Sequence, residues 1–249
     1  ELSADWFSID ERDLVSSIST SLIVSNVERY GTASPYASLV RFGQSAAGET
    51  YFGTGAAVST PGQMSNRPSD EVWISNKLVN IAGVWQQGAD FKASYSYDTK
   101  KWGVVSGRIT GVYLEEYVVQ SLPTDAPYDY RGSYSGSSVY ARYRLYSSLG
   151  WTFKSWSAGI NHTYIPTLKD VAWTGEPEVA AYSTYDARLS YRFSGSNNRW
   201  LKGMAVGAGV NNISDEDPPY INSEGNQNHD INAYDPIGRF YYFDVTYKF

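Results

Sequence analysis

Hydrophobic and polar residues alternate with a period of two along many stretches of this chain. The last stretch, residues 238–249, shows the alternation most clearly. Its apolar positions, separated by single and mostly polar residues, are Tyr241, Phe243, Val245, Tyr247 and Phe249. Successive side chains of a strand point to opposite faces, so the pattern predicts a strand with one apolar face. About ten such residues, tilted, cross the hydrocarbon layer of a bilayer, and the alternative is an amphipathic strand of a soluble sandwich.

The same period predicts about eight strands. They are expected at residues 2–10, 72–98, 104–119, 139–146, 151–165, 185–193, 202–212 and 238–249. Residues 147–150 are expected to form a tight turn. The apolar positions change phase near Ser155, and we interpret this change as a bulge inside the fifth strand.

The connections between these strands alternate between short and long. The long ones are residues 11–70, 121–136, 166–181 and 214–237, and the short ones include residues 98–103 and 194–198. Within the first long connection, the spacing of Leu14, Ile18 and Leu22 predicts a short helix. The asymmetry is typical of outer-membrane barrels, which have short periplasmic turns and longer extracellular loops.

The polar faces of the predicted strands carry charge. Their charged residues include Asp90, Lys92, Arg142, Asp186, Arg188 and Arg192. Because buried charges are costly unless paired or hydrated, these side chains are expected to face a wet lumen while the apolar rows face lipid. The predicted fold class is therefore all-β, an antiparallel up-and-down transmembrane β-barrel with long extracellular loops. The glycine-rich row from Gly203 to Gly209 predicts that another body, such as a plug, approaches closely there.

Composition supports a membrane β protein and argues against other classes. Aromatic residues make up 16% of the chain, with 22 Tyr and 8 Trp, and Tyr and Trp are favoured at membrane interfaces. The mean hydropathy is -0.40 and no long apolar run is present, which excludes a transmembrane helix. The net charge of -6 argues against nucleic acid as a partner.

No pattern in the sequence points to catalysis, a metal or a cofactor, so a non-enzyme is expected. Cysteine is absent, which removes disulfides and thiolate chemistry. His162 and His229 are the only histidines, and neither has a nucleophile or second ligand at a characteristic spacing. The acidic loop at residues 214–219 is interpreted as solvated, because its carboxylates lack the regular spacing of a calcium site.

Aromatic residues in the long loops are the candidate ligand contacts. Those singled out are Tyr128, Tyr130, Trp173, Tyr220 and Tyr234. Aromatic rings beside Asn and Asp suit stacking on a sugar or holding a siderophore. Rings near strand ends can equally belong to the aromatic girdle of a barrel.

Four segments resemble one family, the TonB-dependent receptors of the bacterial outer membrane. Residues 4–19 (ADWFSIDERDLVSSIS) resemble a strand followed by a loop that opens on a helical turn. Residues 80–97 (NIAGVWQQGADFKASYSY) resemble a strand of the form N-x-x-G-x-x-x-x-G-hydrophobic-D. The most specific likeness is to the family's last hairpin, formed by residues 209–220 (GVNNISDEDPPY) and 234–249 (YDPIGRFYYFDVTYKF). Residues 213–214 (IS) depart from it, because an apolar–aromatic pair is more usual there. The last strand, which ends on Phe249 after Tyr241, Phe243, Val245 and Tyr247, also resembles the C-terminal assembly signal of outer-membrane barrels.

The resemblance implies that residues 1–249 are the C-terminal part, about the last eight strands, of a 22-stranded barrel. The N-terminal plug and the short box that engages TonB have no counterpart here, and the chain has neither a start methionine nor a signal peptide, so a fragment is expected. The implied function is uptake of a scarce nutrient, such as a siderophore or an oligosaccharide, across the outer membrane. The implied partners are outer-membrane lipid, the TonB complex through the missing plug, the outer-membrane assembly machinery, and a small-molecule or oligosaccharide ligand.

Two other hypotheses remain open at this point. One is a self-contained eight-stranded outer-membrane barrel whose long loops have an adhesive or structural role. The other is a soluble secreted β protein that binds carbohydrate. The sequence does not identify the substrate, which in this family depends on loops and plug together.

Overall fold

The computed structural model describes residues 1–18, 20–43, 55–67, 71–76, 78–120, 126–136, 138–193, 198, 201–225 and 227–248. The chain divides into two compact units. Unit 1 comprises residues 1–10, 84–119 and 126–249, and unit 2 comprises residues 11–83 and 120–125. None of the helices in these described ranges has the length and apolar character needed to cross a bilayer.

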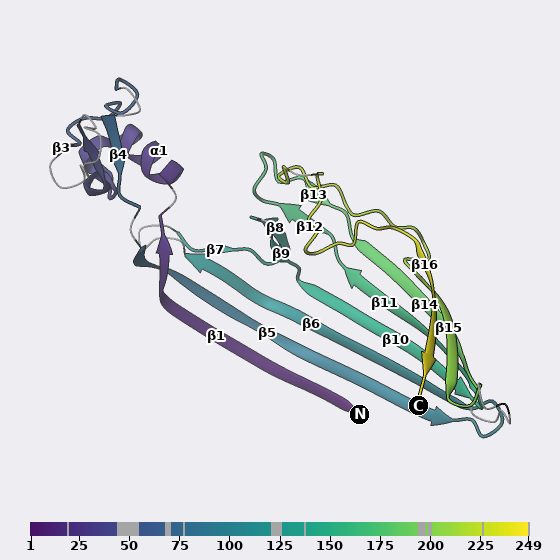
Figure 1. Cartoon of the computed structure of the whole chain (residues 1–249). Coiled ribbons are helices and arrows are strands. Elements are labelled where there is room, and N and C mark those ends of the chain that lie inside the picture. The colour runs from purple at the N-terminus through teal and green to yellow at the C-terminus, as the bar shows by residue number, and fades with distance from the viewer. Residues whose placement is uncertain are drawn as a thin grey trace. The chain divides into compact units, whose positions relative to one another are not determined.

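The main element of unit 1 is one large β-sheet (Figure 1). Its strands, in spatial order, are β1 (Leu2–Ser17), β5 (Leu78–Asp98), β6 (Val104–Gln120), β10 (Tyr143–Phe153), β11 (Trp156–Ile165), β14 (Tyr182–Arg192), β15 (Met204–Asn211) and β16 (Phe240–Tyr247). Residues 11–17 of β1, 78–83 of β5 and 120 of β6 belong to unit 2. The short β7 (Tyr128–Asp129) pairs with the end of β6. All neighbours from β6 to β16 are antiparallel, which confirms the predicted all-β, up-and-down fold.

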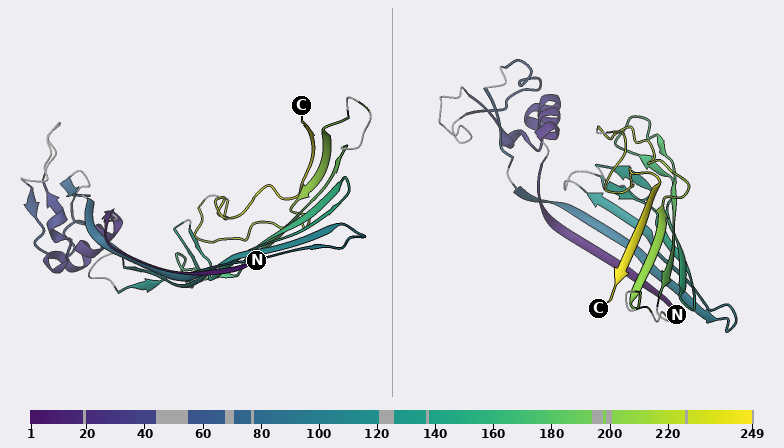
Figure 2. Two further views of the ribbon diagram at one scale, coloured as in Figure 1. Left: turned by 90° about the horizontal axis from the view of Figure 1, so that it is seen from below. Right: turned by 45° about the vertical axis from the view of Figure 1, so that its right-hand side comes forward.

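This sheet is curved and open. In the described part of the chain, β1 and β16 are its two edges, so the barrel is not closed. Figure 2 shows the curvature from the side, with the connection between β15 and β16 lying on the concave face.

The hairpin between β10 and β11 corrects two expectations. Residues 147–150, expected as a turn, lie inside β10, and the change of phase near Ser155 is the hairpin turn itself and not a bulge. Phe153 pairs with Trp156, so only two residues connect the strands. Such a tight reversal shifts the apolar parity by one residue, which imitates a bulge in sequence. Lys154 has a φ of +54° in this turn, a conformation that usually calls for Gly, Asn or Asp, so the normal turn signal is missing.

The helix expected to begin at Leu14 starts later in the chain. Residues 11–17 continue β1, and α1 (Thr20–Tyr30) follows. Among the helical side chains that the structure describes, Ile23 and Val27 are buried, four residues apart, and the side chain of Leu22 lies outside the described part. Because apolar residues at helical spacing over a short segment also fit a strand, pairing of β1 with β5 decides the conformation before α1.

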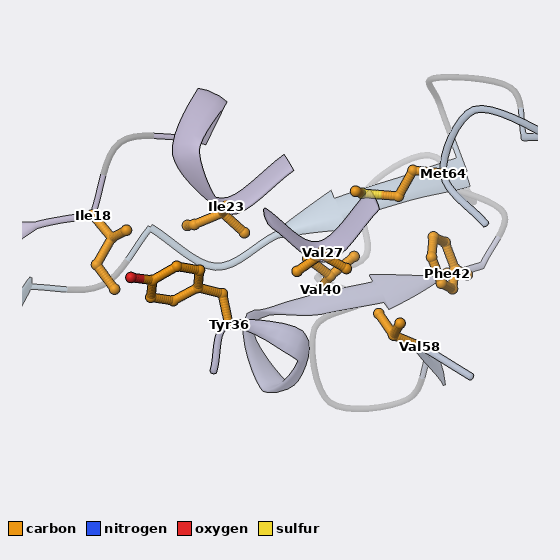
Figure 3. Packing of buried hydrophobic residues seen from close by; sticks show 8 residues of the cluster. All are labelled: Ile18, Ile23, Val27, Tyr36, Val40, Phe42, Val58 and Met64. Atoms are coloured by element: carbon orange, nitrogen blue, oxygen red, sulfur yellow. The ribbon is translucent and has the colours of Figure 1, made fainter. Parts of the chain in front are cut away.

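Unit 2 shows that the first long connection is folded. Besides α1, its elements are η1 (Gly31–Ala33), η2 (Ala37–Leu39), β2 (Val40–Phe42), β3 (Ala56–Ala57) and β4 (Val72–Ile74). Figure 3 shows the buried side chains that join them, Ile18, Ile23, Val27, Tyr36, Val40, Phe42, Val58 and Met64. Gly31 has a φ of +56°, and a Cβ there would lie 2.6 Å from the backbone nitrogen of Pro61, so this close approach requires glycine. Residues 44–54 and 68–70 lie outside the described part.

The other long connections pack together into what we call the loop layer, the described residues within 126–142, 166–181 and 212–239. It contains a small sheet of β13 (Glu178–Val179), β12 (Leu168–Asp170), β8 (Ser133–Ser135) and β9 (Ser138–Tyr140). One buried cluster joins these segments to the strand ends, and its members are Tyr134, Ala141, Ile165, Leu168, Val179, Tyr182, Ile221 and Tyr234. The segments expected as separate loops therefore share one apolar core.

Candidate functional site

Strand register assigns the residues of the main sheet to two faces, because residues opposite each other in an antiparallel pair share a face. Ile160 lies opposite Leu149, and Ala208 lies opposite both Leu189 and Phe243. All of these belong to one face, which we call the apolar face. Its large side chains are exposed, with Leu149 at 57% and Phe243 at 70%. A row of exposed apolar side chains is thus a continuous feature of this sheet.

The predicted assembly strand is β16, and its apolar residues extend this apolar face. Four of them, all exposed and all paired with β15, are Tyr241, Phe243, Val245 and Tyr247. Phe249 lies outside the described residues. Recognition of this strand by an assembly machinery stays a prediction.

The opposite face, which we call the polar face, carries the charges expected to line a lumen. Five of them alternate with apolar-face residues along β5 and β14, namely Asp90, Lys92, Asp186, Arg188 and Arg192. Ala233 of the loop layer lines the same groove as Asp90 and Lys92, so the polar face is the concave one (Figure 2). The structure places Arg142 elsewhere, in the bend before β10, where it lines a different cleft with Arg131.

An ion pair bridges three strands of the polar face. Nη2 of Arg188 on β14 donates to both carboxylate oxygens of Asp244 on β16, at 2.8 Å each. The pair crosses β15 at Gly207, where a Cβ would lie 2.6 Å from Asp244 Oδ1 and 2.7 Å from Arg188 Nη2. At Gly209, the Tyr242 ring occupies the corresponding space. The glycine-rich row therefore makes room for neighbouring side chains, and this accounts for it without the close approach of a plug.

Two other predicted charges also have partners. Nζ of Lys92 lies 3.0 Å from both carboxylate oxygens of Glu1. Oδ1 of Asp186 accepts the backbone N–H of Asn212 at 2.8 Å, which fixes the chain as it leaves β15. Asp90 and Arg192 take part in no ion pair within the described residues. Among the described residues, the polar face thus carries some charges that are paired and others that form no ion pair.

A groove of about 580 Å³ runs along the polar face beneath the loop layer. Its polar lining residues are Ser3, Asp5, Asp90, Lys92, Thr110, Arg144, Tyr146, Thr163 and Tyr164. Carboxylates, cations and hydroxyls all line it, which suits a hydrophilic ligand with several donors and acceptors. Asp5 and Tyr146 are not among the candidate residues that the sequence predicts. The apolar residues of 2–10 do not follow one clear alternation, so they do not assign Asp5 to a face, and the turn expected at residues 147–150 hides the continuity of β10.

The predicted ligand-contact aromatics do not form one site. Tyr128 and Tyr130 lie together, with ring centroids 4.7 Å apart, and Tyr130 continues to Tyr140 at 5.4 Å. Burial raises the pKa of Tyr128, and the nearby carboxylate of Glu176 adds to the rise. Trp173 (51% exposed) lies in the turn after β12 and makes no ring contact with this cluster among the described residues.

Tyr220 and Tyr234 occupy opposite environments within the last connection. Tyr220 is 64% exposed, whereas Tyr234 is 2% exposed and packs edge-to-face on Tyr182. Burial raises the pKa of Tyr234 to about 12, and its hydroxyl has no hydrogen-bond partner among the described residues. Tyr234 is therefore a packing residue in this structure, and ligand contact by these aromatics stays a prediction.

The carboxylates of the last connection hold the connection in shape. Oδ1 of Asp215 accepts the backbone N–H of Arg239 at 2.8 Å, and Glu224 accepts the Tyr134 hydroxyl. The buried Asp170 accepts the N–H of Ser223 at 2.8 Å. Among the residues that the structure describes, no group of three or more His, Asp or Glu side chains could hold a metal ion.

Comparisons with known proteins bear on the fold. No protein-family model matches the sequence, and no curated protein does. Among solved structures, the chain is similar to a mutant of the ferric enterobactin receptor PfeA from Pseudomonas aeruginosa in complex with enterobactin, with 14% identity and a TM-score of 0.54. It is also similar to the siderophore receptor PirA from Acinetobacter baumannii, with 16% identity and a TM-score of 0.56.

In both cases the match covers 100% of this chain and 29% of the receptor, so the chain spans less than a third of their length. At these identities the likeness concerns the fold. The curved antiparallel sheet, its two contrasting faces and the long loops at one end agree with it. The chain has the fold of a portion of the barrel of TonB-dependent receptors, as the resemblance of its sequence predicts.

Proposed function

We propose that this chain forms part of the wall of an outer-membrane receptor that takes up a scarce nutrient by TonB-dependent transport. The observation that carries the proposal is the contrast between the two faces of one sheet. Leu189 is 47% exposed on the apolar face, and its neighbour Arg188 is 47% exposed, by its side chain, on the polar face. An exposed apolar face is costly in water and favourable in lipid, whereas a charged concave face suits a hydrated lumen.

The substrate proposed is a small hydrophilic chelate of the siderophore type. PfeA and PirA support this class, because they are receptors for ferric enterobactin and for a siderophore. The groove on the polar face supports it as well, because it offers both cations and hydroxyls. A self-contained eight-stranded barrel is less well supported, since the sheet is open in the described residues and the similar proteins are larger receptors.

The orientation of the sheet is tested by a matched pair of substitutions on adjacent residues of β11. Ile160 lies on the apolar face and Asn161 on the polar face, opposite Asp186. Placing arginine on the lipid face near the middle of a bilayer costs about 2–4 kcal/mol. We expect Ile160→Arg to reduce the yield of folded protein in outer-membrane fractions and its unfolding free energy in vesicles by that amount, and Asn161→Arg to leave both near wild type. Equal losses in the two variants would refute the orientation.

The transport role is tested by growth of an iron-starved strain that lacks its own siderophore receptors and expresses the gene carrying this chain. We expect growth on a ferric siderophore, and we expect Arg144→Gln in the groove to weaken uptake while Lys154→Gln in the β10–β11 turn does not. Correct insertion together with no uptake of any ferric siderophore would refute the siderophore class and leave the barrel fold intact.

A further inference from the structure

A cleft of about 640 Å³ lies at the loop end of the apolar face, and Tyr164 is the one residue that it shares with the lining of the groove on the polar face. Tyr143 and Tyr164 contribute to its lining, and their rings stack with centroids 6.0 Å apart. Register places both on the apolar face, because Tyr143 lies opposite Tyr113 and Tyr164 lies opposite Leu145. The cleft therefore begins where the apolar face ends, on the side of the sheet that would face lipid.

The cleft contains two cations that form no ion pair among the described residues, and one of them, Lys169, lies opposite Glu178 in the pairing of β12 with β13. Arg142 and Lys169 line it, are exposed, and form no ion pair within the described part of the chain. Arg131 also lines it but is already held, because its Nη2 lies 3.5 Å from Asp129 and its Nη1 donates to the backbone carbonyl of Glu115. Arg142 and Lys169 are thus the cations available to a ligand.

Carboxylates in the same cleft limit the chemistry of that ligand. Glu176 and Glu178 line it together with Asp129, so its three cations are matched by three acids. A small free anion gains little from a lining of balanced charge. A phosphorylated sugar makes use of both signs, because cations bind phosphate oxygens through charge-assisted hydrogen bonds and carboxylates accept hydrogen bonds from hydroxyls.

We propose that this cleft binds the phosphorylated sugar headgroup of a lipid whose acyl chains lie against the apolar face. The inference rests on the membrane location given under the proposed function. An amphiphile is the ligand that reaches both parts of the surface, since the tyrosine pair joins the charged cleft to the exposed apolar row. Aromatic side chains with one wet and one apolar end are favoured at this boundary.

The test compares two double variants of the protein that carries this chain, purified in detergent. Arg142→Gln/Lys169→Gln removes the two available cations, and Lys154→Gln/Arg192→Gln removes the same charge from the opposite end of the strands. Binding of diphosphorylated lipid A and of its dephosphorylated form is measured by native mass spectrometry and by tryptophan fluorescence. Each cation near a membrane surface contributes roughly a factor of five, so we expect the cleft variant to bind the diphosphorylated form about 25-fold more weakly. The control variant should bind it like the wild type.

Three outcomes would overturn the proposal: equal binding by the cleft variant and the wild type, an equal loss in the control variant, or an equal loss for the dephosphorylated lipid. Competition by millimolar inorganic phosphate that matches the lipid's own affinity would also overturn it, because the site would then take the free ion. Protein that fails to enter detergent micelles or vesicles refutes the proposed function instead. The two failures are therefore distinguishable.

Discussion

The ion pair over β15 gives the sharpest test of how this sheet is built. In Gly207→Ala, the new methyl group would lie 2.6 Å from Asp244 Oδ1 and 2.7 Å from Arg188 Nη2, so the pair must move. Both contacts are made by the ends of flexible side chains, which means that the pair separates and the backbone stays. The side chains are 47% and 35% exposed, so the pair contributes about 1 kcal/mol or less to stability.

The matched control is Gly159→Ala on β11. Gly159 lies opposite Arg188 and therefore also on the polar face, and a Cβ there meets only the Leu149 carbonyl, at 3.7 Å. Replacing glycine by alanine in a strand gains about 0.5–1 kcal/mol when nothing obstructs the methyl group. We expect Gly159→Ala to show this gain in unfolding free energy. In Gly207→Ala we expect loss of the ion pair to cancel the gain.

The assay is urea unfolding of the protein in lipid vesicles, followed by tryptophan fluorescence. The two alanine variants should differ in unfolding free energy by about 1 kcal/mol. In an Asp244→Asn background the difference should shrink by more than half, because the charge that the methyl group displaces is already gone. Equal stability of Gly207→Ala and Gly159→Ala, or a difference that persists in the Asp244→Asn background, would refute this account of the glycine row.

Three further predictions concern turns and loops. Tyr234 has a pKa of about 12 in the folded protein, against an ordinary value of 10.0. The stability that its neutral side chain contributes is therefore complete below pH 10 and is lost as the pH rises toward 12. Unfolding free energies measured at pH 9–12 should fall less in Tyr234→Phe than in the wild type. Lys154→Gly should stabilise the β10–β11 hairpin by up to about 1 kcal/mol, because Lys154 has a positive φ, whereas Lys101→Gly in the β5–β6 turn should bring no gain. The hydrogen bond from Ser65 lowers the pKa of Glu28 from 4.5, so unit 2 should lose stability as the pH falls below 4.5, and thermal unfolding should show a weaker loss in Glu28→Gln.

The strands and their faces could be predicted because they depend on a local rule. Alternation with a period of two identified the terminal strand and the stretch from Tyr185 to Phe193, and the structure pairs both in the main sheet. The β10–β11 hairpin was misplaced because the chain reverses at Lys154 and Ser155, which carry no glycine signal, while a glycine stands inside β10 at Gly150. A turn that depends on the pairing of its flanking strands leaves little trace in its own residues.

The loops and the groove could not be predicted, because their contacts join residues far apart in sequence. Tyr134 and Glu224 are 90 positions apart, and Arg188 and Asp244 are 56 apart. Alternation indicates which face of the sheet a charged residue occupies. It does not indicate which residue of another strand is the partner of that charge. The candidate ligand contacts in the loops illustrate the same limit, because the burial of Tyr234 depends on segments from three different connections.

The distribution of buried residues in unit 1 follows from a sheet that is one layer thick. Its buried apolar cluster lies in the loop layer and at the adjoining strand ends, whereas mid-strand residues such as Leu149 and Leu189 are exposed. In water, the loop layer would keep its own core, but the strands would have only their hydrogen-bond ladders and an uncovered apolar face. The lipid must therefore supply the hydrophobic contribution that a second layer supplies in a soluble protein. Extraction into weak detergent should accordingly unfold the strands of the main sheet while Tyr234 stays buried in the loop layer. Amide hydrogen exchange should then become fast in the strands and stay slow in the loop layer. Equally fast exchange in the strands and in the loop layer would mean that the loop layer is not stable without the main sheet.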